Sequence, residues 1–373
     1  MRKSIVLALS MMGVAGGGII APVQAGVVSS DEVTVYVNSA APMAGTREAR
    51  IRDGLTPERA VASIAAAEKI LMDRGVLKAR VLLRGGTYYP CSPIHWTYSP
   101  PGGHITFGTE PGTGDVIIDG SRLESSGTEA AVAMRSAVDE ASIETMAAGY
   151  GMTLDSSDSS VVVDGYTFQY FRNGGVRISG QPGDRTSNIV IRNNTFQYIG
   201  EKYNKAGSGT GYGGVHVTNS SGTRIEGNRF YYLVNDDSPG SIHGVYLANY
   251  SNSSVIRNNR FGYISGDPIR TRHNSKNNIV DSNKFWQAGA YAIFSDWRFD
   301  NEDCGSGNVF KNNQVGYWSY NGDKWNEGAQ GGIDPVRVRL WGHDQATNAN
   351  LGGCSTDPIT FSGDNSYVSS RPW

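Results

Sequence analysis

The second half of the chain repeats one short pattern, as Asn194-Thr195-Phe196, Asn228-Arg229-Phe230, Asn259-Arg260-Phe261 and Asn283-Lys284-Phe285. Gly165-Tyr166-Thr167-Phe168 precedes these copies, and Asn313-Gln314-Val315 follows them in degenerate form. The aromatic position, or Val315 in the last copy, falls at residues 168, 196, 230, 261, 285 and 315, which gives spacings of 28, 34, 31, 24 and 30 residues. A repeat of this length with variable insertions is typical of a solenoid. Long stretches with a period of 3.6 residues are absent, so the coils are predicted to consist of β-strands.

Each coil of such a solenoid buries only an inner row of side chains, so neighbouring coils must stack for the chain to be stable. Stacking places like residues above like. It predicts a column of phenylalanine rings inside and a column of asparagines at a turn, hydrogen-bonded along the axis. We therefore predict an all-β chain that folds as a single-stranded right-handed parallel β-helix, a β-solenoid.

Upstream of the repeats, the segment from Thr56 to about Arg74 has the pattern of a helix. Thr56 suits the N-cap and Pro57 the first helical position, and apolar side chains recur on one face. We expect this helix to cap the open end of the first coil, which would otherwise be an unpaired sheet edge. Short strands are predicted to follow it at residues 79–83, 105–107 and 116–120.

The composition narrows the class of protein. The 373 residues include 48 glycines, only 18% of them are charged, and the formal net charge is -2. Frequent glycine with so little charge argues against a helical bundle, and a near-neutral balance gives no reason to expect a nucleic-acid partner. We expect a monomer.

The first 25 residues have the pattern of a secretory signal peptide. Arg2 and Lys3 precede an apolar stretch at residues 5–21, and Val23-Gln24-Ala25 offers a small-residue cleavage site. A membrane anchor is the alternative interpretation. No other stretch approaches the length of a membrane-spanning helix. We therefore expect residues 26–373 to form one domain that is secreted, in the extracellular space or the periplasm, with no membrane partner.

The chain has three cysteines, Cys91, Cys304 and Cys354. In an oxidising compartment the last two could close a disulfide, which would leave Cys91 buried or free. No pair has the spacing of a zinc site, so no structural zinc is expected.

A second set of β-like segments precedes the repeated pattern and aligns coil by coil at residues 175–179, 214–218, 244–248, 268–272 and 292–296. Side chains alternate across a strand, so placing the branched apolar residue of each segment inward defines the outward rows. The first outward row is Arg177, His216, Tyr246, Arg270 and Phe294. The second, two residues further on, is Ser179, Thr218, Ala248, Arg272 and Asp296. With strands about 4.8 Å apart, the first four residues would form a ladder of roughly 15 Å, close to three sugar residues.

Several stretches of the chain resemble the secreted pectate-lyase-like superfamily, namely Val35-Tyr36-Val37-Asn38, Thr56-Pro57 with the following helix, and Arg84-Gly85-Gly86-Thr87-Tyr88. The stretch His243-Gly244-Val245-Tyr246-Leu247, with the Asn-x-Phe coils after it, looks most like the β-helical alginate lyases. The resemblance implies a parallel β-helix that acts on an acidic polysaccharide. Lyases of this kind often use a Lys with an Arg, whereas the aligned rows here contain Arg but no Lys.

Outward Arg, His and Tyr side chains are suited to β-elimination on a uronic-acid polymer. An Arg can bind and neutralise the uronate carboxylate, a base removes the C5 proton, and an acid protonates the departing O4. His216 is the candidate base and Tyr246 the candidate acid, although one Tyr could fill both roles. Arg270 and Arg272 would stabilise the enolate-like intermediate. Candidate substrate-binding residues are Arg177, His243, His273, Lys202, Lys205 and Asp296.

Other interpretations remain open. Any β-helix has outward polar residues, His243 has inward parity, and His243 and His273 could each replace the catalytic His or be structural. A glycoside hydrolase needs two carboxylates, of which the rows supply only Asp296. A C5-epimerase would share the first step, and a non-catalytic carbohydrate-binding protein would bind without turnover. No cofactor is required, but the acidic residues at positions 236, 237 and 267 leave a calcium site possible beside their interpretation as turn residues.

Overall fold

The computed structural model describes residues 32–42, 46–90, 94–122, 149–155, 158–205, 211–298, 302–325, 336–340, 359–362 and 364–373. The predicted signal peptide, Cys91 and Cys354 lie outside these residues. Among the described residues, no helix combines the length and the apolar character needed to cross a membrane.

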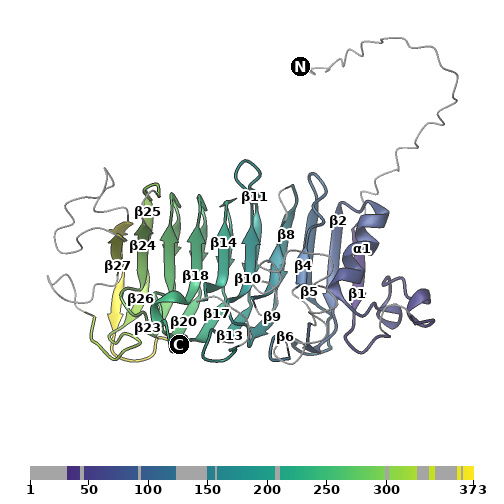
Figure 1. The fold of residues 1–373 in the computed structure, drawn as a ribbon, viewed down its shortest axis with the longest axis horizontal. Coiled ribbons are helices and arrows are strands. Elements are labelled where there is room, and N and C mark those ends of the chain that lie inside the picture. The colour runs from purple at the N-terminus through teal and green to yellow at the C-terminus, as the bar shows by residue number, and fades with distance from the viewer. Residues whose placement is uncertain are drawn as a thin grey trace, which may run out of the picture.

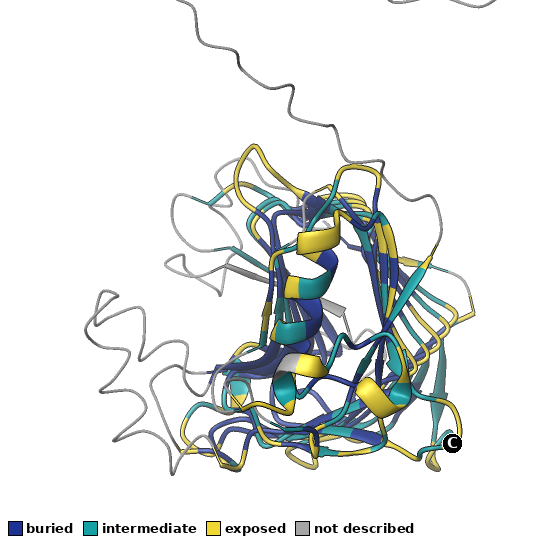
Figure 2. Cartoon of the chain, turned by 90° about the vertical axis from the view of Figure 1, so that its right-hand side faces the viewer, coloured by how far each residue is buried: buried dark blue, intermediate teal, exposed yellow. Residues whose placement is uncertain are grey.

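Three long parallel sheets wind around one core, and each coil adds one strand to each sheet in turn (Figure 1). Strands of successive coils overlay one another when the stack is viewed from its N-terminal end (Figure 2). The ten-stranded sheet consists of β1 (Val33–Val37), β2 (Lys78–Leu83), β5 (His104–Thr109), β8 (Ser160–Asp164), β12 (Ile189–Arg192), β16 (Arg224–Glu226), β19 (Val255–Arg257), β22 (Ile279–Asp281), β25 (Asn308–Lys311) and β28 (Ile359–Ser362).

The nine-stranded sheet carries the repeated Asn-x-Phe pattern. It consists of β3 (Gly86–Tyr88), β6 (Val116–Asp119), β9 (Tyr166–Gln169), β13 (Thr195–Ile199), β17 (Arg229–Leu233), β20 (Arg260–Ile264), β23 (Lys284–Ala288), β26 (Gln314–Gly316) and β29 (Ser366–Val368).

The eight-stranded sheet carries the aligned polar rows. It consists of β4 (Ile94–Trp96), β7 (Tyr150–Leu154), β10 (Gly174–Ser179), β14 (Gly213–Thr218), β18 (His243–Ala248), β21 (Ile269–Arg272), β24 (Phe294–Arg298) and β27 (Val336–Leu340). A small parallel pair, β11 (Thr186–Ser187) and β15 (Ser220–Ser221), lies at a turn. The predicted parallel β-helix is confirmed, including the strands expected around residues 79–83, 105–107 and 116–120.

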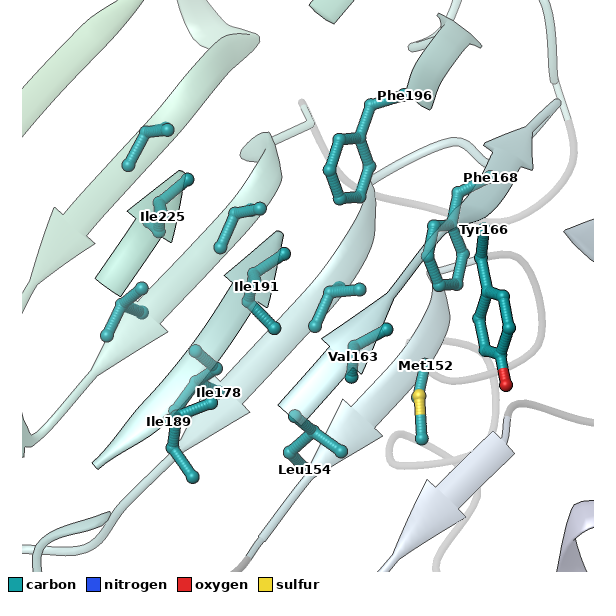
Figure 3. Packing of buried hydrophobic residues seen from close by; sticks show 14 of the residues in the cluster. Met152, Leu154, Val163, Tyr166, Phe168, Ile178, Ile189, Ile191, Phe196 and Ile225 are labelled. Atoms are coloured by element: carbon teal, nitrogen blue, oxygen red, sulfur yellow. The ribbon is translucent and has the colours of Figure 1, made fainter. Parts of the chain in front are cut away.

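The predicted phenylalanine column is present in the core. Phe168, Phe196, Phe230, Phe261 and Phe285 are paired in register, Val315 follows them, and all but Val315 are fully buried. Successive rings stack with centroids 4.7–5.3 Å apart. Figure 3 shows Phe168 and Phe196 beside the aliphatic residues of the other sheets.

The predicted asparagine column is present at the turn between the ten- and nine-stranded sheets. The column comprises Asn194, Asn228, Asn259, Asn283, Asn313 and Asn365. The backbone N–H of each of the first five donates to the side-chain oxygen of the Asn one coil on, over 2.8–3.0 Å. Each of the first five also donates from Nδ2 to a strand carbonyl of a preceding coil. The column therefore satisfies buried backbone groups where the chain changes direction.

The N-terminal helix is shorter than predicted. Helix α1 spans Ile64–Arg74, and Ser63 rather than Thr56 is its N-cap, accepting a hydrogen bond from the Ala66 N–H over 3.2 Å. Pro57 instead begins the short 3-10 helix η2 (Pro57–Arg59). Val61 forms a parallel bridge with Val37, so the chain is extended between η2 and α1. Two further 3-10 helices are η1 (Ala49–Ile51) and η3 (Pro239–Ser241).

Helix α1 lies at the purple end of the stack and packs against β1, β2 and β4 (Figure 1). Its buried side chains Ile64, Ala67 and Leu71 join the core. That the helix serves to cap this end of the coil stays a prediction.

Candidate active site

The first outward row of the eight-stranded sheet has the predicted register through four coils. Arg177 on β10 pairs with His216 on β14, then Tyr246 on β18, then Arg270 on β21. Four polar side chains of three types are thus presented one strand apart, and no two neighbours are of the same type.

The row departs from the prediction at β24. Arg270 pairs with Ser295 and Arg272 with Trp297, so the predicted positions of Phe294 and Asp296 in the outward rows are wrong by one residue. Ile293 and Phe294 are both apolar and both buried, so either could fill the inward position by pattern alone. A slip of one residue moves every side chain of a strand to the other face.

Asp296 therefore points into the coil, in an interior column that includes Val217, Leu247 and Thr271. It is 4% exposed and accepts a hydrogen bond from Thr271 Oγ1 over 2.5 Å. Burial raises the pKa of this carboxyl to about 7, against the opposing effect of the Thr271 hydrogen bond. The proposed contact of Asp296 with substrate loses its geometric basis.

An aromatic stack surrounds His216 on the outward face. The imidazole lies 4.7 Å from the Tyr212 ring and 5.0 Å from the Tyr246 ring, nearly parallel to both. The Tyr150 hydroxyl lies 2.6 Å from His216 Nδ1. Sequence reasoning missed both tyrosines, because Tyr150 begins β7, a strand outside the aligned segments, and Tyr212 stands just before β14.

The surroundings of His216 keep its imidazole neutral. Burial, followed by the positive charge of Arg177, lowers the pKa of this imidazole to about 3, and burial raises the pKa of Tyr150 well above its usual range. His216 Nδ1 is the one hydrogen-bond partner of the Tyr150 hydroxyl within the described ranges, so we assign Tyr150 as the donor. The neutral imidazole then carries its proton on Nε2 and is a weak base.

Arg270 is held by a buried carboxylate. Its Nη2 donates to Asp267 Oδ2 over 3.0 Å, and its guanidinium lies 3.9 Å from the centroid of the Trp297 ring. Asp267 also accepts hydrogen bonds from the backbone N–H groups of Tyr291 and Ala292 and from Ser295 Oγ. Burial acts to raise the pKa of Asp267, but the charge of Arg270 and these contacts outweigh it and lower the pKa below its usual value.

His243 lies on the outward face, not inward as its parity suggests. Its ring is 5.3 Å from the Tyr246 ring and its Nδ1 is 2.7 Å from the Asp267 carbonyl oxygen. The irregularity lies at Gly244, where a Cβ would stand 2.6 Å from the inward Phe261 ring, so both Gly244 and Val245 face the core. Burial, followed by the charge of Arg270, lowers the pKa of His243 well below its usual value, so this imidazole is neutral too.

Arg272 links a second carboxylate to Tyr246. Its Nε donates to both oxygens of Glu302, over 2.7 and 2.9 Å, and its Nη2 also contacts Glu302. Its Nη1 donates to the Tyr246 hydroxyl oxygen over 3.4 Å. Glu302 follows β24 in a loop and was missed, because the aligned rows contain only strand residues.

Three predicted substrate-binding residues have partners outside the row. Lys202 pairs with Asp236 over 3.4 Å, and Lys205 pairs with Glu201. His273 contacts Asn249 Oδ1 over 3.2 Å and the Tyr250 ring, at a turn where its φ is 48°. Their roles in substrate binding stay predictions.

In the described part of the chain, no group of three or more His, Cys, Asp and Glu side chains is arranged to hold a metal ion. Asp236 and Asp237 instead direct their backbone N–H groups to Glu201 Oε2, and Asp267 holds Arg270. Cys304 is disulfide-bonded, and because the other two cysteines lie outside the described residues, its pairing with Cys354 stays a prediction.

Three solved structures resemble this chain at low identity. Pectate lyase Pel9A is 12% identical with a TM-score of 0.46, and the match covers 91% of this chain and 80% of that one. An alginate lyase from Paenibacillus sp. str. FPU-7 is 9% identical with a TM-score of 0.46, and the match covers 91% of this chain and 96% of that one. A GH136 lacto-N-biosidase from Eubacterium ramulus is 12% identical with a TM-score of 0.44, and the match covers 82% of this chain and 57% of that one. The matched region thus spans 57% of the length of the lacto-N-biosidase. Comparison with curated protein sequences gives no match.

A family model described as a right-handed β-helix region matches residues 112–315, which is more than half of the chain. This range contains the phenylalanine column, the asparagine column from Asn194 to Asn313, and the strands that carry Arg177, His216, Tyr246 and Arg270. The handedness predicted from the sequence agrees with the match. The chain belongs to the right-handed β-helix family.

Proposed function

We propose that this protein is a secreted polysaccharide lyase that cleaves a uronic-acid polymer by β-elimination, with alginate as the first substrate to test. One observation carries the proposal: the Tyr246 hydroxyl accepts a hydrogen bond from Arg272 Nη1, between the neutral His216 and the buried Arg270 on the same outward row. A phenol held by a guanidinium, at the middle of a row about as long as three sugars, is suited to moving a proton on a bound polymer.

Tyr246 transfers the protons in the proposed reaction. In its deprotonated form it removes the C5 proton of the uronate, and the electron pair of the C5–H bond forms the C4–C5 double bond. The C4–O4 bond breaks, and the same hydroxyl returns its proton to the departing O4. The products are an unsaturated uronate end and a new hydroxyl end, and no water is consumed.

The other side chains hold the substrate and the tyrosine. Arg272 Nη1 donates to the phenolic oxygen while Tyr246 is deprotonated, and Glu302 fixes the direction of that guanidinium. His216 is better suited to donate a hydrogen bond from Nε2 than to act as the base, because its pKa lies near 3. Arg270 and Arg272 already hold carboxylates, so they supply hydrogen-bond donors rather than uncompensated charge.

The test is the ultraviolet absorbance of the unsaturated product. Purified protein is mixed with alginate, polymannuronate, polyguluronate, polygalacturonate, glucuronan or chondroitin, each with and without EDTA. A rise with at least one polymer supports elimination, and loss of the rise with EDTA would add a calcium site to the proposal. A flat trace with all six polymers, accompanied by new reducing ends, would contradict it.

A glycoside hydrolase is the second candidate, because Asp296 has the raised pKa expected of a general acid. Its inward direction and 4% exposure count against that role, since a general acid must reach the glycosidic oxygen. A C5-epimerase would invert the sugar without cleavage, which proton nuclear magnetic resonance of the polymer would reveal. A non-catalytic binding protein would retain the polymer without changing it.

The proposed secretion rests on the signal-peptide pattern of residues 1–25. N-terminal sequencing of protein recovered from the medium or periplasm of a producing cell would test it. Cleavage close to Ala25 is the expected result, and an intact N-terminus retained inside the cell would contradict it.

A further inference from the structure

On strands β10 and β21 of the outward face, three arginines with described side chains differ in what balances their charge. Arg270 has Asp267 and Arg272 has Glu302. Arg177 forms no ion pair with any described residue. Its buried Nε has no hydrogen-bond partner among them, as is also true of Arg270 Nε, so the missing ion pair is what sets Arg177 apart. Among the three, Arg177 is therefore the arginine whose positive charge no described carboxylate balances, and which is left for a ligand.

The groups beside Arg177 do not supply the missing anion. Its guanidinium lies 5.7 Å from the Tyr150 ring, and His216 is its register partner on the next strand. Both neighbours are neutral, because Tyr150 keeps its proton and the charge of Arg177 helps to keep the proton off the imidazole. A buried guanidinium donor without a partner is costly, and a bidentate carboxylate would satisfy it.

We propose that Arg177 binds a carboxylate of the substrate, on a sugar two positions away from the one that reacts at Tyr246. The inference rests on the proposed function and adds the subsite that selects for charge. Arg177 and Tyr246 stand on β10 and β18, two strands apart, which is about 10 Å along the row at about 4.8 Å per strand. At roughly one sugar per strand, this distance spans three consecutive sugars. The substrate is then a run of at least three uronates, charged at the sugar over Arg177.

The first test separates binding from chemistry. In Arg177→Gln we expect KM for the polymer that the wild type cleaves to rise about ten- to a hundredfold, with kcat within about threefold, because a charge-assisted contact made before and during reaction is lost. Arg177→Lys should recover part of the loss, since it keeps the charge. Arg185→Gln is the matched control, because Arg185 belongs to the same coil but lies against the Tyr250 ring; it should change neither constant.

The second test does not depend on turnover. Trimannuronate and its fully methyl-esterified form are titrated calorimetrically into Tyr246→Phe and into the double variant Tyr246→Phe/Arg177→Gln. We expect the acid to bind at least tenfold more tightly than the ester to the single variant, and the difference to vanish in the double variant.

The outcomes separate the assignment of Arg177 from the proposed lyase function. If the wild type cleaves a uronate polymer but Arg177→Gln leaves KM unchanged, or if acid and ester differ equally in both titrated variants, the assignment of Arg177 is overturned and the lyase stands. If the wild type neither cleaves nor binds any uronate polymer, the proposed function and this inference both fail.

Discussion

The nine-stranded sheet and the outward face of the eight-stranded sheet follow opposite rules. Along the nine-stranded sheet three columns repeat one residue type: Phe in the core, Asn at the preceding turn, and the stacked rings of Tyr170, Tyr198, Tyr232 and Tyr263. Along the outward face the row reads Arg177, His216, Tyr246 and Arg270, with no residue type repeated in adjacent coils.

The difference follows from how stacked coils gain stability. A residue that stacks or hydrogen-bonds with its own kind can be repeated in every coil, and each copy stabilises its neighbours. Unlike neighbours gain nothing from repetition. A row of unlike polar residues is therefore better explained by a ligand than by the fold. Two arginines of the same face, Arg270 and Arg272, are paired with the carboxylates of Asp267 and Glu302, which balance their charge.

The largest expected effect is on kcat, and it distinguishes Tyr246 on the outward face of the eight-stranded sheet from Tyr232 in the nine-stranded sheet. Tyr246→Phe removes the hydroxyl held by Arg272, and kcat should fall by about a hundredfold to ten-thousandfold, the usual contribution of proton transfer by a positioned group. Tyr232→Phe, in the stacked tyrosine column, should leave kcat unchanged. Initial rates of product absorbance measure both. Equal losses in the two variants would remove the distinction between the regions.

The next effect is on stability and concerns the asparagine column. Asn259→Ala leaves the buried N–H of Asn228 without its acceptor and removes the side-chain donor to the carbonyl of Ile225, so the free energy of unfolding should fall by about 3 to 5 kcal/mol. Asn258→Gly, at the neighbouring exposed position with φ 56°, should change it by less than about 1 kcal/mol. Urea denaturation followed by circular dichroism measures both. A column that tolerated Asn259→Ala would not be what holds the coils in register.

The smallest effect concerns Asp296, whose carboxyl faces the core although its strand also borders the candidate site. Its pKa is about 7 in the folded protein and about 3.9 in an unfolded chain, so the folded state binds the proton more tightly. Its contribution to stability is therefore greatest below about pH 4 and is lost as the pH rises through 7, by at most about 1.4 kcal/mol per pH unit.

Asp296→Asn cannot titrate, so its stability relative to the wild type should rise between about pH 4 and pH 7 and then level off. Denaturation at a series of pH values checks this. A difference between the two proteins that is independent of pH would mean that the carboxyl reaches solvent, which would restore Asp296 as a candidate on the outward face.

The same contrast explains what could be predicted from the sequence. The Phe and Asn columns, the parallel β-helix and the first four members of the outward row were predicted correctly, because residues that repeat in every coil reveal their own alignment. The alignment failed at β24, where Ile293 and Phe294 suit the inward position equally well. The start of helix α1 was also predicted wrongly, because the parallel bridge between Val61 and Val37 depends on strand β1, which is distant in the sequence.

The residues that complete the candidate site were missed for a related reason. Tyr212, Asp267 and Glu302 come from connections between strands, whose lengths differ from coil to coil, so no repeat marks them. Their roles depend on which strand ends the winding of the chain brings together. The low pKa of His216 depends likewise on burial and on Arg177 one strand away, and it is the reason that we propose Tyr246 rather than His216 as the base.

We propose that the row of unlike residues carries out an elimination, and mass spectrometry of products formed in water enriched in heavy oxygen distinguishes this reaction from hydrolysis. The polymer with the highest rate in the absorbance panel, or with the most new reducing ends if absorbance stays flat, is digested with the wild-type protein. Elimination consumes no water, so we predict unsaturated fragments that carry no heavy oxygen. One heavy oxygen atom incorporated per cleaved bond would show hydrolysis and contradict the account.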